Sequence, residues 1–230
     1  MKSGAFFFKV LDSIIDFIFP PACPVCGGAF IKEGIICQDC RNAIIKCSFE
    51  YKAPPRNIEH TDNICILLPY NTHCRTLIHS LKYHGMPSIG LFLGDLMGRK
   101  VLQHFSLPEN TLIVPVPLHP TRLRERGYNQ SERIAQGFAA FTGLEIAETM
   151  LIRIRPTETQ TVLDGEQRAH NVRNASRFNG ITSLSGRSVI LIDDVMTTGS
   201  TISECARALK EGGAGVVTVS VAVTPHIEDE

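Results

Sequence analysis

Two adjacent acids followed by a run of small hydroxyl residues form the most chemically suggestive stretch of the sequence. The acids are Asp193 and Asp194. The run after them contains Thr197, Thr198, Gly199, Ser200 and Thr201. Backbone N–H groups and hydroxyls in such a run bind anions where the run opens a helix, and a glycine lets backbone approach a phosphate closely. Carboxylates would repel a phosphate but accept hydrogen bonds from sugar hydroxyls or hold Mg²⁺, so the stretch indicates a phosphosugar site.

The stretch lies where a strand would lead into a helix. Residues 189–192 are all aliphatic, which is typical of a strand buried on both faces of a parallel sheet. Apolar residues then recur at helical spacing over 202–209, and Thr201 with Glu204 has the spacing of a capping box. A second apolar strand is predicted over 216–223. The β-α-β unit would place its polar loop where open α/β sheets bind ligands, although a solvated acid pair beside an ordinary capped helix is the alternative.

Three arginines alternate along a segment that follows another predicted strand. The strand, within residues 111–117, must stop or lie at an edge at its alternating prolines, because proline donates no ladder hydrogen bond. Arg122, Arg124 and Arg126 come next, in what we predict to be a loop. Beside a phosphosugar site, guanidinium groups are suited to hold a pyrophosphate or phosphodiester, whereas elsewhere they would form a solvated surface.

Four cysteines form two C-x₂-C pairs near the N-terminus. They are Cys23, Cys26, Cys37 and Cys40. Two such pairs predict a structural Zn²⁺ site with four thiolate ligands and no open position for a substrate, with Cys47 as a candidate replacement ligand. A unit this small lacks a core of its own, so we expect the metal to supply much of its folding free energy.

Composition places the chain among globular proteins. Its 230 residues are 43% hydrophobic and 20% charged, and the formal net charge is zero, which gives no whole-molecule attraction for polyanions. The first 20 residues are broken by charges and have no cleavage site, so we predict an amphipathic helix that docks on the protein, with a position on a membrane surface as the alternative. Without a secretion signal or a transmembrane segment, the eight cysteines are expected to be thiols or metal ligands of a cytoplasmic protein.

The order of segments predicts three parts. The N-terminal helix, residues 1–20, precedes a zinc ribbon over 21–60, and a proline-bearing polar stretch separates that ribbon from a main domain over 61–230. Within the main domain, a strand is predicted over 64–68 and helices over about 76–81, 88–104 and 134–141. The basic, aperiodic region 152–178 is expected to be either a lid over the site or an exposed loop.

The acid pair and the hydroxyl run resemble the phosphoribosyl-pyrophosphate (PRPP) motif of type I phosphoribosyltransferases. The resemblance implies that Asp193 and Asp194 hold the ribose diol at the catalytic centre and that residues 197–201 bind the 5′-phosphate, with Mg²⁺ accompanying PRPP. Thr197 stands where hypoxanthine/guanine enzymes have an acid, which argues against a 6-oxopurine acceptor.

Taken whole, the chain resembles the ComF family of bacterial competence-associated proteins. The shared features are the four-cysteine pairs, Leu81-Lys82-Tyr83-x-Gly85, the segment from Pro115 to Gln130, Thr157-x-x-Gln160-x-x-Leu163, Arg168-x-x-Asn171-Val172 and the PRPP motif. The resemblance implies an α/β fold, with a type I phosphoribosyltransferase-like parallel sheet flanked by helices and a small N-terminal four-cysteine zinc ribbon. It also implies a link to DNA uptake, a pyrophosphate loop at about 117–126 and a lid within 155–171.

Three functional hypotheses follow from these features. The first is a transferase that uses PRPP or a related phosphosugar in a Mg²⁺-dependent pentosyl transfer. The second is a non-catalytic module in which PRPP or a nucleotide regulates binding of single-stranded DNA by the ribbon and the arginine segments. The third is an adaptor whose ribbon and N-terminal helix dock other competence proteins.

Overall fold

The computed structural model describes residues 22–28, 35–154, 175–180 and 183–224. The predicted helix over 1–20 and the predicted lid within 155–171 lie outside these residues. Across the described part of the chain, the helices are all too short or too polar to cross a membrane.

In chain order the elements are α2 (Gln38–Glu50), β1 (Asn63–Pro69), α3 (Thr72–Tyr83), α4 (Pro87–His104), β2 (Leu112–Pro115), α5 (Pro120–Arg126), α6 (Gln130–Thr142), β3 (Glu145–Ile146), β4 (Leu151–Arg153), β5 (Ser176–Phe178), β6 (Ser188–Val195), α8 (Ser200–Glu211) and β7 (Val216–Thr224).

Five parallel strands form the main sheet, in the order β1-β7-β6-β2-β3. Successive side chains of a strand point to opposite faces, and both faces of β6 are covered. Ile190 and Ile192 join the apolar cluster that includes α4 and α6, whereas Val189 and Leu191 join the cluster beneath α8. This arrangement confirms the predicted α/β fold, and it explains why β6 is an unbroken aliphatic run.

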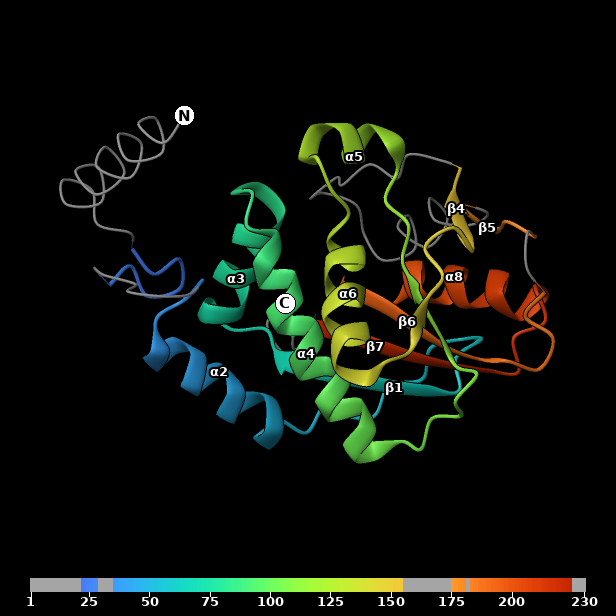
Figure 1. Ribbon diagram of the computed structural model, residues 1–230, viewed down its shortest axis with the longest axis horizontal. Helices are drawn as coiled ribbons and strands as arrows, with labels where there is room; N and C mark the ends of the chain where they lie inside the picture. Colours follow the sequence, from blue (N-terminus) through green and yellow to red (C-terminus); the bar gives the residue numbers. More distant parts are fainter. Residues whose placement is uncertain (1–21, 29–34, 155–174, 181–182, 225–230) are drawn as a thin grey trace, which may run out of the picture.

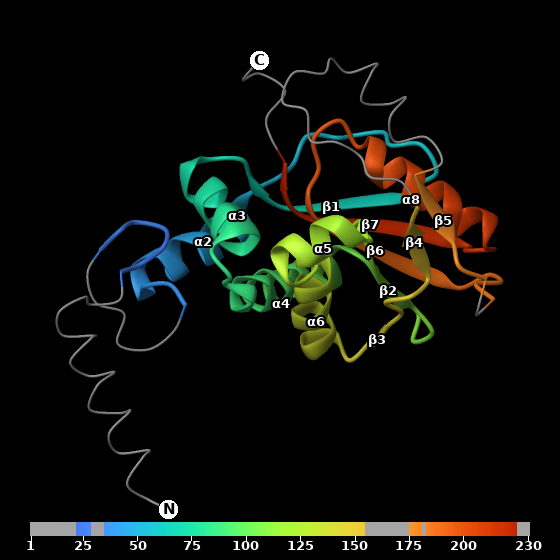
Figure 2. The same cartoon turned by 90° about the horizontal axis from the view of Figure 1, so that it is seen from above.

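The helices divide between the two sides of the sheet. Residues of α4 and α6 belong to the apolar cluster on one face and residues of α8 to the cluster on the other, and Figures 1 and 2 both show α8 apart from α2, α3, α4 and α6. β2 stops at Pro115, as its prolines predict. A separate antiparallel pair, β4 with β5, flanks the part of the chain that would hold the lid.

Glycines allow α4 and α6 to cross at very short range. A Cβ added to Gly94 would lie 2.0 Å from the carbonyl oxygen of Ile134, and one added to Gly137 would lie 2.1 Å from the carbonyl oxygen of Leu91. These contacts are with backbone, which cannot move aside as a flexible side chain can. The close crossing therefore fixes where α6 begins. The helix begins at the edge of the sheet formed by the carboxyl ends of β2 and β6.

A buried lysine joins the cysteine-bearing unit to the main domain. Lys100 of α4 donates from Nζ to the carbonyl oxygens of Ser48 (2.8 Å), Tyr51 (2.8 Å) and Leu67 (3.3 Å). The first two carbonyls belong to the end of α2, where the helix dipole favours a cation. Burial lowers the pKa of Lys100, partly offset by nearby thiols, so the three carbonyls compensate a costly desolvation.

One prediction about helix ends is wrong. The predicted capping box would make Thr201 the N-cap of α8. The helix instead begins at Ser200, and Gly199 is its N-cap. Glu204 therefore lies inside the helix, where it accepts a hydrogen bond from Arg207 Nη2 at 2.8 Å. The glycine in a left-handed conformation, φ 82°, places the N-cap two residues earlier than the hydroxyl pattern predicts.

We predict that Gly94→Ala will lower the free energy of unfolding by about 3 kcal/mol, because the new methyl group must push the α6 backbone away. Gly98→Ala in the same helix is the matched control. Its Cβ would meet the Phe141 side chain at 3.1 Å, and that half-exposed ring can shift. Urea denaturation of the two variants tests this, and equal stabilities would contradict the close-crossing argument.

Candidate functional site

A cavity of about 310 Å³ opens at the carboxyl ends of β2 and β6. The last turn of α3, the loop after β2, α5, the start of α6, β4 and the loop after β6 all contribute to its walls. This is the edge at which open α/β sheets bind ligands. Both acids singled out in the sequence line the cavity, together with Thr197 and Thr201.

Two hydrogen bonds hold the Asp193 carboxyl group in place. Its Oδ1 accepts from the Ser131 hydroxyl at 3.0 Å and from the Asp194 backbone N–H at 2.9 Å. The residue is only 8% exposed. Burial and the adjacent charge of Asp194 raise the pKa of Asp193 to about 7, although these hydrogen bonds and Lys82 act in the opposite direction. The carboxyl group is therefore poised between its two protonation states near neutral pH.

Asp194 makes an ion pair with a lysine from the other side of the cavity. Its Oδ2 lies 2.5 Å from Nζ of Lys82, at the end of α3. Burial lowers the pKa of Lys82, but the charges of Asp194 and Asp193 outweigh that effect and raise it above its usual value. The Tyr128 hydroxyl donates to the Leu81 carbonyl and ties this turn of α3 to the segment before α6.

The hydroxyl run divides into residues that line the cavity and residues that shape the turn. Thr197 and Thr201 line it, whereas Thr198, Gly199 and Ser200 are not among its described lining residues. The hydroxyls of Thr198 and Ser200 lie 2.9 Å apart in a hydrogen bond. At Gly199, a Cβ would lie 2.3 Å from Cδ1 of Ile58, so that side of the glycine faces a packed side chain. The predicted contact of Gly199 with a phosphate stays a prediction.

The arginine segment is a helix and not a loop, which corrects its predicted structure. Arg122, Arg124 and Arg126 lie on α5, which ends at Gly127. Residues four apart share a helix face and residues two apart do not. Arg122 and Arg126 line the cavity, and Arg124 is not among the described residues that do. The guanidinium carbon of Arg126 lies 5.3 Å from the ring centroid of Tyr83, at the cavity rim.

Several cavity residues received no predicted role. Lys82, Gln130 and Ser131 come from other elements, and no local pattern links them to the acids. Gln130 is only 4% exposed, and its Oε1 has no hydrogen-bond partner among the described residues. A buried carbonyl without a partner costs roughly 1–3 kcal/mol. This unpartnered oxygen on a cavity-lining residue is a feature that no local sequence pattern predicts.

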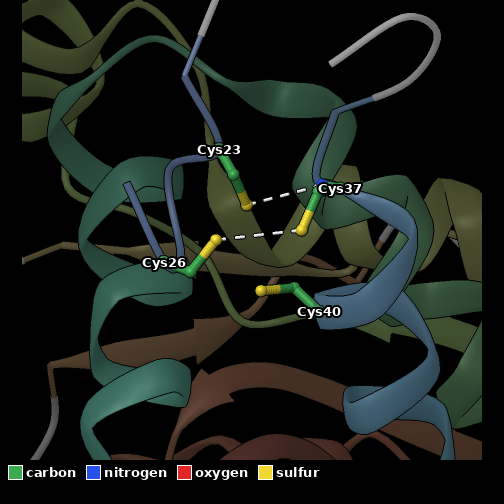
Figure 3. Close-up of side chains that lie close together, drawn as sticks. All are labelled: Cys23, Cys26, Cys37 and Cys40. Atoms are coloured by element: carbon green, nitrogen blue, oxygen red, sulfur yellow. Dashed lines mark hydrogen bonds between the residues drawn. The ribbon is translucent and has the colours of Figure 1, made fainter. Parts of the chain in front are cut away.

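The four predicted cysteine ligands converge on one point. Figure 3 shows the Cys23, Cys26, Cys37 and Cys40 side chains pointing toward one another, and their sulfur atoms all lie within 4.8 Å of each other. Zn–S bonds of about 2.3 Å in a tetrahedron place sulfurs about 3.8 Å apart. The Cys26 and Cys37 sulfurs are 3.8 Å apart. Cys47, the candidate replacement ligand, is not a member of this group.

The surroundings of the sulfurs favour thiolates bound to a cation. Backbone N–H groups of Gly28 and Cys37 point at the sulfurs of Cys26 and Cys23, each at 3.4 Å. Burial raises the pKa of Cys23, but N–H groups of Cys37, Cys26 and Val25 outweigh this and lower it to about 6. For Cys40, burial and the neighbouring thiols raise the pKa, since four crowded sulfurs cannot all ionise without a positive charge between them. The group fits a structural Zn²⁺ ion.

Comparison with known proteins finds the same two parts. Residues 132–229 match the family described as "Phosphoribosyl transferase domain", and residues 14–50 match "Double zinc ribbon domain". Together with the sheet and the four-cysteine group, they define a zinc-ribbon protein with a phosphoribosyltransferase-type domain. The chain is 30% identical over 204 residues to the DNA utilization protein YhgH of Salmonella typhi, covering 86% of this chain and 87% of that one.

Two further relatives carry competence names. The chain is 29% identical over 202 residues to Competence protein F of Haemophilus influenzae, covering 85% of this chain and 82% of that one. It is 30% identical over 128 residues to Competence protein ComFC of Streptococcus pneumoniae, covering 54% of each. The chain belongs to the ComF family.

We predict that Asp193 makes the ligand-free protein less stable as pH rises from about 4 to about 7. Its pKa is higher in the folded protein than in the unfolded chain, so the folded state binds the proton more tightly. That advantage is complete below the unfolded pKa and lost as pH rises through the folded pKa. Asp193→Asn should match the parent near pH 3.5 and exceed its stability at pH 8 by on the order of 2–4 kcal/mol.

Thermal unfolding of both proteins at a series of pH values measures this difference. A stability difference that stays constant from pH 4.5 to pH 8 would contradict the raised pKa of Asp193.

Proposed function

We propose that the cavity binds PRPP with Mg²⁺. The observation that carries the proposal is the pairing of two buried acids with a hydroxyl-rich turn at one edge of the sheet. The carboxylates supply acceptors for two ribose hydroxyls, and the turn at the start of α8 supplies N–H groups and hydroxyls for the 5′-phosphate. Arg122 and Arg126, which also line the cavity, supply positive charge for the pyrophosphate.

The same arrangement supports transfer of the phosphoribosyl group. The bond between the anomeric carbon and pyrophosphate breaks, pyrophosphate leaves with the electron pair, and an acceptor nitrogen forms the new bond and releases a proton to water. Asp193 and Asp194 would fix the ribose as positive charge develops at that carbon, and Lys82 would limit the repulsion between the acids and the phosphates. Mg²⁺ accompanying PRPP would supply positive charge that neutralises the departing pyrophosphate.

The biological setting is proposed from the relatives. Their names refer to DNA utilization and to competence, and the match to YhgH extends over 86% of this chain. We infer that this chain acts in the uptake or use of DNA, with its phosphosugar site serving that process.

Calorimetric titration with PRPP and Mg²⁺ tests the site assignment. We predict that the parent binds and that the double variant Asp193→Asn/Asp194→Asn loses about 100-fold in affinity, because two charge-assisted hydrogen bonds of about 1.5 kcal/mol or more each are weakened. Loss of affinity cannot be ascribed to a weakened fold if the unfolding temperature of the variant equals or exceeds that of the parent. A double variant that binds as tightly as the parent would refute the assignment.

The arginines provide a matched control for the same titration. Arg122→Met and Arg126→Met should each weaken binding about tenfold or more, whereas Arg124→Met, on the same helix, should leave it unchanged.

Pyrophosphate release in the presence of nucleobases, nucleosides and amines separates a transferase from a protein that only binds PRPP.

A second candidate function, binding of single-stranded DNA, is favoured by a row of rings along α3. The His79 ring lies 4.9 Å from Tyr83 and 5.0 Å from His84, and Tyr83 is 63% exposed with Arg126 across its face. A groove of about 450 Å³ runs beside this row. Its lining consists of Pro24, Thr72, Arg75, Thr76, His79, Ser80 and His84. Exposed rings beside cations and hydroxyls suit stacked bases and a phosphodiester backbone.

We predict that a fluorescent oligothymidylate binds this face with an affinity that falls as salt is added. Tyr83→Ala should weaken binding about tenfold, because stacking on an aromatic ring contributes roughly 1–3 kcal/mol per base. Arg75→Ala should also weaken binding and reduce the salt dependence. Arg99→Ala removes the same charge from α4 and is the control. Fluorescence anisotropy that does not distinguish Tyr83→Ala and Arg75→Ala from Arg99→Ala would rule out this face.

A further inference from the structure

The segment between α2 and β1 packs against the turn proposed to bind the 5′-phosphate. In the sequence it was only a polar boundary between two parts. In the structure, Tyr51, Ala53 and Ile58 pack on the apolar cluster beneath α8, and the Tyr51 carbonyl is fixed by Lys100. The segment therefore follows a defined path from the cysteine-bearing unit to the turn at residues 197–201.

Arg56 makes the polar contact between this segment and the turn. Its Nη1 donates to the carbonyl oxygen of Thr197 at 2.9 Å. In a planar trans peptide, the C=O and the following N–H point in opposite directions. A guanidinium that holds the Thr197 carbonyl on one side therefore turns the Thr198 N–H toward the other side. An anion site depends on N–H groups that are already oriented when the anion arrives.

Ile58 makes the apolar contact. The nearest atoms to a Cβ built on Gly199 all belong to the Ile58 side chain, and the closest is 2.3 Å away. Gly199 has φ 82°, a conformation that side-chain-bearing residues rarely adopt. Ile58 therefore occupies the space behind the turn and stops the glycine from moving backward.

We propose that Arg56 and Ile58 are positioning residues for the phosphate-binding turn. They hold the turn from behind, one through a carbonyl and the other through packing at the glycine. The affinity of the phosphosugar site thus depends on the segment that leaves the cysteine-bearing unit. The inference rests on the proposed PRPP site, and it adds that the phosphoribosyltransferase-type domain is completed by residues that precede its first strand.

The test measures ligand affinity and local motion in the full chain. Arg56→Met should weaken calorimetric binding of PRPP with Mg²⁺ about tenfold or more, and Arg56→Lys should restore part of it. Amide hydrogen exchange at residues 197–201 should become faster in Arg56→Met without ligand. Lys52→Met removes an exposed cation from the same segment and should match the parent in both measurements.

Ile58→Ala tests the apolar contact in the same way, with Ile58→Val as the milder variant if the first folds poorly. Faster exchange at 197–201 together with weaker PRPP binding is expected. Parent-like affinity and parent-like exchange in Arg56→Met would overturn the proposal. A parent that binds no PRPP would defeat the proposed function instead, and the exchange measurement would still decide whether Arg56 and Ile58 hold the turn.

Discussion

Burying two adjacent carboxyl groups at the end of a strand is the constraint on which the site depends. Such groups are costly in an apolar interior unless hydrogen bonds and opposite charge compensate them. Asp193 accepts a hydrogen bond from a hydroxyl at the start of α6, and Asp194 forms an ion pair with an ammonium group at the end of α3. The two helices must therefore both reach this edge. The glycine crossing of α4 and α6 is the packing feature that allows α6 to begin there.

The same constraint explains how a site with two acids could accept an anionic ligand. With Lys82 beside Asp194 and a pKa of about 7 for Asp193, the acid pair carries less negative charge than its sequence implies. A phosphosugar would meet acceptors for its hydroxyl edge without the full repulsion of two free carboxylates. Arg122 and Arg126 add positive charge to the lining of the same cavity.

Local pattern was enough to predict the parts of the site that are contiguous in sequence. The strand β6, the acids at its end and the helix α8 all follow from apolar periodicity. The spacing of the two C-x₂-C pairs also predicted that their four sulfur atoms lie close together, because ligand type and spacing define a tetrahedral thiolate site. In these cases, the residues that decide the structure are near neighbours in the chain.

What could not be predicted depends on contacts between distant segments. Lys82 meets Asp194, and Arg56 meets Thr197, across separations that no periodicity encodes. The arginines were read as a loop because alternate spacing hides a short helix, and only the helix shows that Arg122 and Arg126 share a face. The capping prediction failed because hydroxyl residues adjoin a glycine that can turn the chain earlier.

The cysteine-bearing unit illustrates how tertiary context alters a prediction about stability. Its length suggested a metal-dependent unit without a core. Yet Ile36 and Ile44 are buried in the same apolar cluster as Leu68 of β1, and each buried isoleucine contributes about 1.5–3 kcal/mol. Lys100 then fixes the end of α2 through backbone carbonyls, which any sequence at those positions could offer. The zinc ligands therefore organise one end of a unit whose other end is held by the main core. The chain leaves that held end directly toward Arg56, so the segment that contacts the turn at residues 197–201 begins at the Lys100 contacts.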